Sequence, residues 1–299
     1  MINMTEILNI KAKRNRMKKL IILPVAMLAL FGCTDTPKDT GDEEKSNEKN
    51  VKVEPESARP AHWGYLENDG PSTWATLSSK YMLCGGGSHQ SPIDIIDLDS
   101  ASEVSFEINY ESTTVHISHN ENMDDIIDNG HTIQLDIDNG SSFTLKGETY
   151  HLKQFHFHTP SEHTLNGKHY PMEMHFVHQA DDGRLAVIGV FVEEGEVANE
   201  NIQLVIDNLP ESKGEMIHLE DLNIALNVVI PPTEETYHYS GSLTTPPCSE
   251  DVEWLVLKNP ISTIKEHITS IHNKISKNNR PTQNLNDRGV SKVIDQIDE

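Results

Sequence analysis

The sequence has few cysteines, few basic side chains and no long uninterrupted apolar run. Cysteine occurs three times in 299 residues, as Cys33, Cys84 and Cys248, which excludes a dense disulfide framework. Lys and Arg number 24 against 47 Asp and Glu, and the formal net charge is −23. This negative charge disfavours nucleic acid and an anionic membrane surface as partners, because both would repel the protein. No internal repeat is evident.

What is present is ordinary for a soluble globular protein with one sizeable core, since 36% of the residues are hydrophobic and 24% are charged. We expect a single folded domain at residues 61–292 and a short C-terminal tail at 293–299. Residues 34–60 are Asp, Glu, Lys, Ser, Thr, Asn and Pro with almost no large apolar side chain. They cannot bury a core, and we expect a disordered acidic linker there.

The first 33 residues are cationic and then apolar, with the hydrophobic run at residues 20–31. This run is too short for a comfortable membrane span and is typical of a secretory signal. The run ends at Gly32 and Cys33, which resembles a bacterial lipoprotein cleavage site, although Phe31 is bulkier than the residue usual there. Met17 precedes two lysines and is an alternative start.

Two outcomes of export stay open. In the first, Cys33 is lipidated and anchors an otherwise soluble protein in the periplasm or cell envelope. The protein then contacts the membrane only through this lipid. In the second, the signal is removed and Cys33 stays unmodified. The pattern favours lipidation.

Runs of alternating or β-branched residues recur along the rest of the chain. They predict strands at residues 104–109, 113–118, 131–137, 142–146, 150–158, 172–179, 185–192 and 252–258. Helical periodicity is confined to residues 199–208, 221–228 and 260–275. Many strands and few helices, without regular alternation of the two, favour a mainly β domain built on one large, mostly antiparallel sheet.

The run at residues 154–158 alternates polar and aromatic side chains. On a strand, Gln154, His156 and His158 leave from one face while the two phenylalanines pack on the other. A second alternating run at residues 173–178 can pair antiparallel with the first and supplies His175. Three imidazoles on two strands leave a tetrahedral metal ion one open position, which is the layout of a catalytic zinc site.

A single histidine on a strand is usually only half-buried, and this is the simplest interpretation of any one of the 16 histidines. The spacing favours a metal site here, because Gln154 and Glu173 lie on the same face as the imidazoles. A ligating imidazole needs an acceptor for its second ring proton. Gln154, which precedes the first two histidines on this face, and Glu173, which precedes His175, are placed to be such acceptors.

These runs resemble the metal site of the alpha-class carbonic anhydrases. Further motifs similar to that family follow in the family's order at residues 91–95, 129–131, 161–164, 241–247 and 279–281, and the resemblance extends from about His62 to about Arg288. Several separated motifs in register are far more specific than one pattern match. The resemblance implies a central twisted sheet of about ten strands with peripheral helices.

The resemblance also implies a lyase with one Zn2+ per chain that interconverts carbon dioxide and bicarbonate plus a proton. Zinc lowers the pKa of a bound water so that hydroxide is available near neutral pH, an effect for which carbonic anhydrase is itself the standard example. Thr244 would accept a hydrogen bond from this hydroxide and donate its own proton to ionised Glu162. For Thr244 alone, a turn hydroxyl is the simpler interpretation.

Two further groups of residues match the family. Five line its apolar substrate pocket, although each is individually an ordinary core or turn residue: Val177, Val187, Leu243, Thr245 and Trp254. His131 matches the proton shuttle, since imidazole titrates near the working pH; an exposed turn histidine is the simpler alternative. Tyr65, Asn129 and Gln134 would hold a water chain. Gln134 stands where relatives commonly have Asn, and Gln179 replaces an aromatic.

The resemblance further implies a disulfide between Cys84 and Cys248, with a free thiol at each cysteine as the alternative. It also implies cis peptide bonds before Pro92 and Pro247. A homodimer is an open outcome that no sequence feature decides. Two other functions are compatible with the same fold: a catalytically silent binding module and a zinc-dependent esterase. Intact His156, His158, His175, Glu162 and Thr244 argue against the first, and no ester recognition site is apparent for the second.

Overall fold

A computed structural model of the chain describes residues 62–97, 106–109, 113–119, 122–123, 127–128, 132–137, 140–224, 226, 230 and 235–293. All of them lie in one compact unit, Glu54–Glu299. The expectations for residues 1–60, Asn129, His131 and the C-terminal tail from 294 onward lie outside the described residues. No helix among the described residues is long and apolar enough to cross a membrane.

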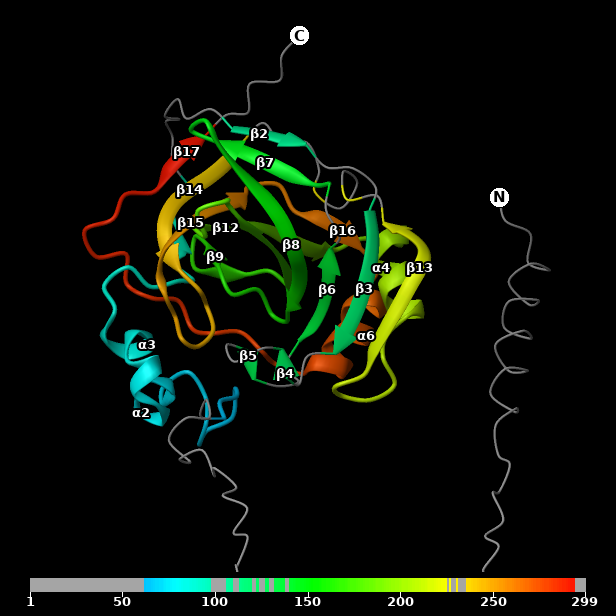
Figure 1. Ribbon diagram of the computed structural model, residues 1–299, viewed down its shortest axis with the longest axis horizontal. Helices are drawn as coiled ribbons and strands as arrows, with labels where there is room; N and C mark the ends of the chain where they lie inside the picture. The colour runs from blue at the N-terminus through cyan, green and yellow to red at the C-terminus, as the bar shows by residue number, and fades with distance from the viewer. Residues whose placement is uncertain are drawn as a thin grey trace, which may run out of the picture. The chain divides into compact units, whose positions relative to one another are not determined.

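A sheet of twelve strands dominates the domain (Figure 1). Nine strands follow one another across it in the order β13-β3-β6-β8-β11-β12-β15-β14-β17, with β16 beside β12, β7 beside β8 and β2 beside β7. The strands are β2 (Phe106–Asn109), β3 (Thr113–His119), β6 (Ile133–Ile137), β7 (Ser142–Leu145), β8 (Glu148–His158), β11 (Met172–Gln179), β12 (Leu185–Glu194), β13 (Met216–Ile224), β14 (Thr236–Ser242), β15 (Glu250–Leu257), β16 (Ile261–Thr263) and β17 (Ser291–Val293).

The remaining elements are short or peripheral. Two small sheets consist of β1 (Asp94–Ile95), β9 (Thr164–Leu165) and β10 (Lys168–His169), and of β4 (Asn122–Met123) with β5 (Ile127–Asp128). The helices are α2 (Trp74–Leu77), the 3-10 turn η2 (Ser79–Tyr81), α3 (Leu83–Gly86), α4 (Glu200–Asp207) and α6 (Lys265–Ile275). Figure 1 shows α2 and α3 on one side of the sheet and α4 and α6 on the other, near β3 and β13.

The predicted fold class is confirmed, and the central strands carry the alternation from which it was predicted. All pairings in the large sheet are antiparallel except those of β12 with β15 and with β16. Along β8, Phe155 and Phe157 are fully buried in the larger core cluster, which Ile202 of α4 and Ile271 of α6 also enter. That cluster occupies the face of β8 opposite to Gln154, His156 and His158.

Helix α4 begins where the sequence predicts, because the Asn199 side chain caps it by accepting hydrogen bonds from the backbone N–H groups of Asn201 and Ile202. Helix α6 begins only at Lys265, because Ile261–Thr263 instead form β16 beside β12. The sequence-based helix at 221–228 is wrong in its first half. Strand β13 continues to Ile224 and pairs with β3, so tertiary pairing overrides the local helical period there.

Candidate metal centre

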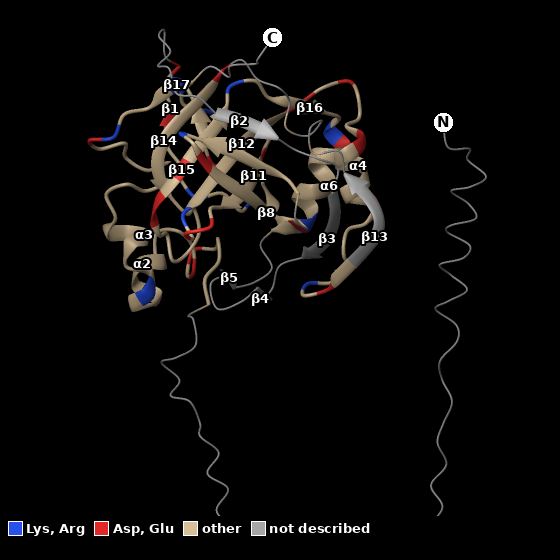
Figure 2. Ribbon diagram, turned by 45° about the horizontal axis from the view of Figure 1, so that its top comes forward, with Lys and Arg blue, Asp and Glu red and all other residues tan. Residues whose placement is uncertain are grey.

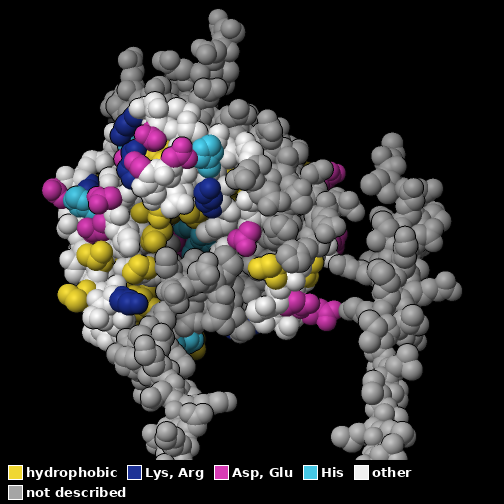
Figure 3. Space-filling view, in the orientation of Figure 1, with side chains coloured by type: hydrophobic (Ala, Val, Ile, Leu, Met, Phe, Trp, Pro, Cys, Tyr) yellow, Lys and Arg dark blue, Asp and Glu magenta, His cyan; other side chains and the backbone are white. Residues whose placement is uncertain are grey.

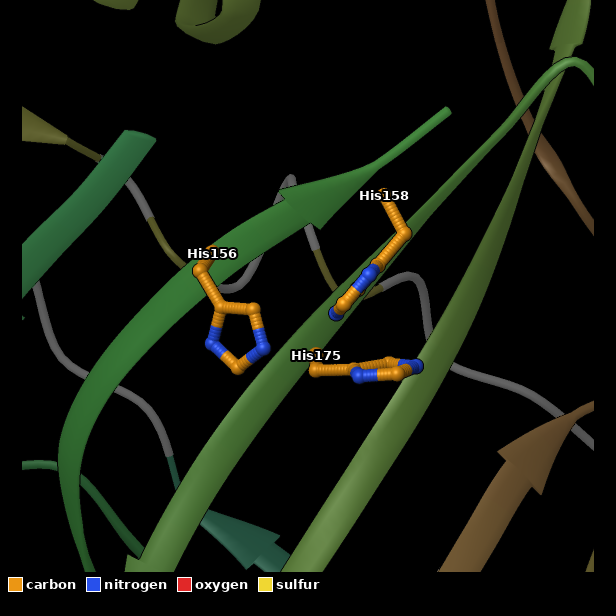
Figure 4. A group of neighbouring side chains, drawn as sticks. All are labelled: His156, His158 and His175. Carbon is orange, nitrogen blue, oxygen red and sulfur yellow. The ribbon is translucent and has the colours of Figure 1, made fainter. Parts of the chain in front are cut away.

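Strands β8 and β11 form an antiparallel pair whose register brings three histidines together. His175 pairs with His156, and Glu173 pairs with His158. Residues paired across neighbouring strands project from the same face of a sheet. Figure 4 shows the result: the His156 and His158 rings extend from one strand toward the His175 ring on the next. The ring centroids of His158 and His175 are 4.5 Å apart.

Each of the three imidazoles has one nitrogen held by a hydrogen-bond acceptor. Nδ1 of His156 donates to Oε1 of Gln154 at 2.8 Å, and Nε2 of His175 donates to Oε1 of Glu173 at 2.9 Å, as the sequence predicts. Nδ1 of His158 donates instead to the backbone carbonyl of Asn278 at 2.8 Å. Gln154 therefore orients His156, while the acceptor for His158 is a backbone group that the sequence analysis does not name.

The other nitrogen of each ring faces a common point. One ligand atom from each histidine lies within 4.8 Å of the others, as metal binding requires. Nε2 of His158 is buried and has no hydrogen-bond partner among the described residues, although an orphaned buried nitrogen is unfavourable. Burial lowers the pKa of His156 and of His158, which favours the neutral imidazole that a metal binds. The donor set therefore fits a metal ion such as zinc.

Glu173 is fully buried and joins the histidine cluster to the loop after β8. Its Oε1 also accepts from Nδ1 of His163 at 2.7 Å, and its Oε2 accepts from the backbone N–H groups of Glu162 and His163 at 2.8 and 2.9 Å. Burial alone would raise the pKa of Glu173, but His163 and His175 hold it well below its usual range. Glu173 is therefore a carboxylate that fixes the orientation of His175.

Glu162 lies at the edge of the three-histidine cluster and is fully buried. Its Oε1 accepts from the backbone N–H of Arg280 at 2.8 Å. Its Oε2 lies 3.5 Å from Nε2 of His158 and 3.8 Å from Nδ1 of His175, and has no hydrogen-bond partner among the described residues. One acceptor oxygen thus points at the site and is available to a further donor.

Thr244 is buried in the loop between β14 and β15, with 5% of its surface exposed. No hydrogen bond between Thr244 and Glu162 is present among the described residues, so their expected link stays a prediction. The loop itself is fastened on both sides of Thr244. The N–H of Leu243 donates to the carbonyl of Ser249 at 2.9 Å, and the N–H of Ser242 donates to Oγ of Ser91 at 3.0 Å.

Covalent and backbone features hold the same loop against the N-terminal part of the domain. Cys84 and Cys248 form a disulfide, as the family resemblance implies. The bonds before Pro92 and Pro247 are cis as expected, and the bond before Pro160 is a third cis bond that the sequence did not indicate. Arg280 donates from its guanidinium to the backbone carbonyls of Ser91 and Cys84, both at 2.7 Å.

The apolar residues assigned to a substrate pocket gather in one cluster next to the histidines. Val187 and Trp254 are buried in it, while Val177 and Leu243 are partly buried and pack against it. The Trp254 ring lies 4.9 Å from that of His175. Thr245 is half-buried in the following loop. Figure 3 shows histidine side chains at the bottom of a hollow bordered on one side by hydrophobic side chains.

The residues assigned to the water chain are only partly described. Gln134 is buried on β6, directly opposite His156, and its amide donates to Oδ1 of Asp136 at 2.6 Å. Tyr65 is half-buried, and both burial and the nearby Glu162 carboxylate raise its pKa well above the usual value. Gln179 is half-buried at the end of β11. Asn129 and His131 lie outside the described residues, so their assignments stay predictions.

Sequence reasoning missed two supports of the site. The Asn278 carbonyl carries no sequence signal, because every residue has one. The His163 imidazole lies within a motif quoted for the family resemblance, and its Nε2 accepts from the Tyr239 hydroxyl at 2.7 Å. The alternation of Tyr237 and Tyr239 could have indicated this contact, because it predicts a strand that carries the Tyr239 hydroxyl. That strand, β14, is also absent from the sequence-based prediction.

The large, mostly antiparallel sheet and the cluster of three histidines that could hold a metal ion describe a class of protein, and comparison with known proteins identifies its family. The family model described as eukaryotic-type carbonic anhydrase matches residues 69–294. The chain belongs to this carbonic anhydrase family.

Similar proteins cover most of the chain. A carbonic anhydrase of Nostoc sp. is 38% identical over 245 residues, which are 80% of this chain and 89% of that protein. One of Pectobacterium carotovorum is 39% identical over 76% of this chain and 89% of its own length. The solved alpha-carbonic anhydrase of Thermovibrio ammonificans, in complex with the inhibitor sulfanilamide, is 40% identical with a TM-score of 0.70, covering 77% of this chain and 99% of that one.

Proposed function

We propose that the protein is a zinc-dependent carbonic anhydrase that catalyses the reversible hydration of carbon dioxide to bicarbonate and a proton. The observation that carries the proposal is the convergence of three ring nitrogens, one each from His156, His158 and His175, while an acceptor holds the other nitrogen of every ring. Three protein ligands leave one tetrahedral position open, which is the arrangement of catalytic rather than structural zinc. One Zn2+ per chain is expected.

When bound, zinc supplies hydroxide near neutral pH by acidifying a water molecule. The protein's own part is to aim this nucleophile. Oε2 of Glu162, which lacks a hydrogen-bond partner among the described residues, would accept a hydrogen bond from the Thr244 hydroxyl, and the Thr244 oxygen would then act as an acceptor toward the nucleophile. The Thr244 hydroxyl has one proton, which it would donate to Glu162, so Thr244 could only accept a hydrogen bond from the nucleophile. This direction would fix which lone pair of the nucleophile faces the substrate.

Carbon dioxide is uncharged and forms weak hydrogen bonds, so an apolar wall beside the nucleophile suits it. Val177, Val187, Leu243 and Trp254 provide such a wall in one cluster, and Thr245 lies in the loop next to it. A hydrophobic lining also disfavours a layer of ordered water between carbon dioxide and the metal centre.

The proton released by each turnover must reach the solvent. His131 is proposed as the shuttle, because imidazole both accepts and releases protons near neutral pH. Tyr65, Asn129 and Gln134 would hold the intervening water molecules. The raised pKa of Tyr65 keeps its hydroxyl protonated, so it is available as a hydrogen-bond donor.

We further infer that the protein is exported and lipid-anchored at Cys33, in the periplasm or cell envelope. The cationic and apolar start of the sequence and Gly32-Cys33 support this. Mass spectrometry of the native protein decides the matter: a diacylated amino terminus at Cys33 is expected. An unmodified amino terminus beyond Cys33 in a freely soluble product would remove the anchor from the proposal.

The test of the activity is carbon dioxide hydration by the purified protein, measured by stopped flow before and after removal of metal with a chelator. Activity is expected to disappear on chelation and to return with one equivalent of Zn2+. A catalytically silent binding module would bind zinc and show no hydration at any metal load. Inhibition by sulfanilamide, the inhibitor bound to the Thermovibrio ammonificans enzyme, is expected to follow zinc occupancy.

A further inference from the structure

The N-terminal segment of the described domain folds into a small lobe. Trp63, Trp74, Tyr81, Cys84 and Cys248 form a separate buried cluster at its centre. The indole Nε1 of Trp74 donates to the carbonyl of Gly64 at 2.9 Å, and the guanidinium of Arg280 lies 5.7 Å from the Trp74 ring. The lobe is therefore a packed structure.

Large apolar side chains project outward from this lobe. Met82 has 64% and Leu83 has 42% of its surface exposed, and Leu66 on the same lobe has 75%. The neighbours Tyr81 and Cys84 point into the buried cluster, which leaves Met82 and Leu83 outside. Half of the six large exposed hydrophobic side chains among the described residues therefore lie between residues 66 and 83. Met82 and Leu83 are consecutive, so their exposed side chains can form one apolar surface of the kind that marks an interaction site.

The charge of this surface differs from that of the rest of the protein. The chain has a net charge of −23, yet residues 70–88 contain no Asp or Glu and one cation, Lys80. Lys80 is exposed on η2, next to Met82. In the ribbon of Figure 2 a basic position lies beside α2, while acidic positions lie on adjoining segments and elsewhere on the domain. We call Lys80, Met82 and Leu83 the apolar tip.

The lobe that carries the apolar tip includes Trp63, one residue after His62, the first described residue. Residues 34–61, 28 in all, separate Cys33 from His62. A random coil of that length has a root-mean-square end-to-end distance of roughly 30 Å. A tether of this size gives the lobe an effective concentration on the order of millimolar at the surface that holds the anchor. A contact too weak to recruit a free protein then suffices to orient a tethered one.

We propose that the apolar tip rests on the phospholipid bilayer that carries the anchor, with Met82 and Leu83 among the upper acyl chains and Lys80 beside lipid phosphates. This inference rests on the proposed anchoring at Cys33. Exposed Leu and Met side chains next to a lysine match the interface of a bilayer, where apolar contacts and cation–phosphate pairs occur together. Residues 70–88 contain no Asp or Glu, so repulsion by lipid phosphates is weaker there than at Glu67 and Asp69 of the same lobe or over the rest of the acidic surface.

The test uses the chain from Cys33 onward, coupled through the Cys33 thiol to a maleimide lipid in phosphatidylcholine and phosphatidylglycerol vesicles. Cys84 and Cys248 are joined in the disulfide, so Cys33 is the one thiol left among the three cysteines. A Met82→Trp variant reports contact with the bilayer through quenching of the added fluorescence by brominated acyl chains. Val197→Trp is the matched control, because Val197 is 75% exposed near α4, away from the lobe.

Loss of the added emission is expected for Met82→Trp and not for Val197→Trp. Introducing Leu83→Ser or Lys80→Glu into the Met82→Trp chain should reduce the quenching. Equal quenching at both positions, or none at Met82→Trp, overturns the proposal. Chemical coupling at Cys33 takes the place of acylation, so the quenching reports docking whether or not the native protein is acylated. Carbon dioxide hydration, measured on the same samples, reports the enzymatic function separately.

A second copy of the chain is the other occupant to test. Stable interfaces bury roughly 800 Å² on each partner, more than three side chains supply. Sedimentation of the uncoupled chain is therefore expected to give the same mass for the parent and for the Met82→Ser/Leu83→Ser variant. A dimer that this double substitution converts to a monomer would assign the apolar tip to self-association and overturn docking on the membrane.

Discussion

The histidine cluster on β8 and β11 and the loop between β14 and β15 meet at one site but are held by different kinds of contact. His156, His158 and His175 take their places from strand register, which the alternation within two short runs determines. Thr244 takes its place from contacts with distant parts of the chain, including the Ser91 hydroxyl and the disulfide to Cys84. Local sequence positions the three candidate metal ligands, and long-range contacts position Thr244, the group proposed to aim the nucleophile.

The strongest test of this comparison is removal of a strand-borne ligand. His175→Ala should lose stoichiometric zinc, because two imidazoles do not complete the site, and hydration of carbon dioxide should fall to the uncatalysed rate. Elemental analysis and stopped-flow assays measure both. His151→Ala is the matched control: His151 lies on the same strand β8 with its side chain 46% exposed, outside the cluster. Full zinc content and activity in His175→Ala would remove the site assignment.

The next largest effect is expected from the loop. Thr244→Val keeps the shape of the side chain and removes its hydroxyl, so zinc should stay bound while kcat/KM falls by about a hundredfold through misaligned attack. Thr236→Val is the control, since the Thr236 hydroxyl is also buried and has no hydrogen-bond partner among the described residues. If Thr244→Val lost zinc together with activity, the loop would support the ligands themselves and the contrast with the strands would fail.

The same contrast explains what the sequence predicted. A period of two on residues 154–158 and 173–178 was enough to place three ligands and the acceptors Gln154 and Glu173 on one face. The acceptor for His158 could not be predicted in this way, because the Asn278 carbonyl is a backbone group from a segment 120 residues away in sequence. The helix expected at 221–228 failed for a related reason, since pairing with β3 decides that segment.

Loop geometry was predicted only through the resemblance to a known family. Nothing in the local pattern around Cys84 or Cys248 indicates that the two lie together, since 164 residues separate them. Arg280 likewise reaches Ser91, Cys84 and Glu162 from a distant part of the sequence, and is almost wholly buried by those contacts. Such contacts depend on the complete fold.

His131 belongs neither to the histidine cluster nor to the loop between β14 and β15, so its substitution tests a third step, the release of the proton. If it relays the proton, His131→Ala leaves the ligands, Thr244 and the apolar wall unchanged, so kcat should fall by on the order of a hundredfold while kcat/KM for carbon dioxide is preserved. High concentrations of small imidazole buffers should restore much of the turnover. A histidine with no role in proton transfer would leave kcat unchanged, or would lower both parameters together without rescue by buffer.

The smallest effect on activity is expected from the disulfide, although its effect on stability should be large. Replacing both cysteines, as Cys84→Ser/Cys248→Ser, removes a cross-link across a long loop and should lower the free energy of unfolding by about 2–5 kcal/mol. Because the hydrogen bonds from the Leu243 N–H to the Ser249 carbonyl and from the Ser242 N–H to the Ser91 hydroxyl remain, the loop should keep its conformation in the folded protein. Zinc content and kcat/KM at low temperature should therefore match the parent, while urea unfolding shifts to lower denaturant.

The parent with its disulfide reduced serves as a control without any substitution. A selective fall in kcat/KM with zinc retained would show that the disulfide itself positions Thr244, and the loop would then depend on one covalent bond rather than on its whole set of contacts.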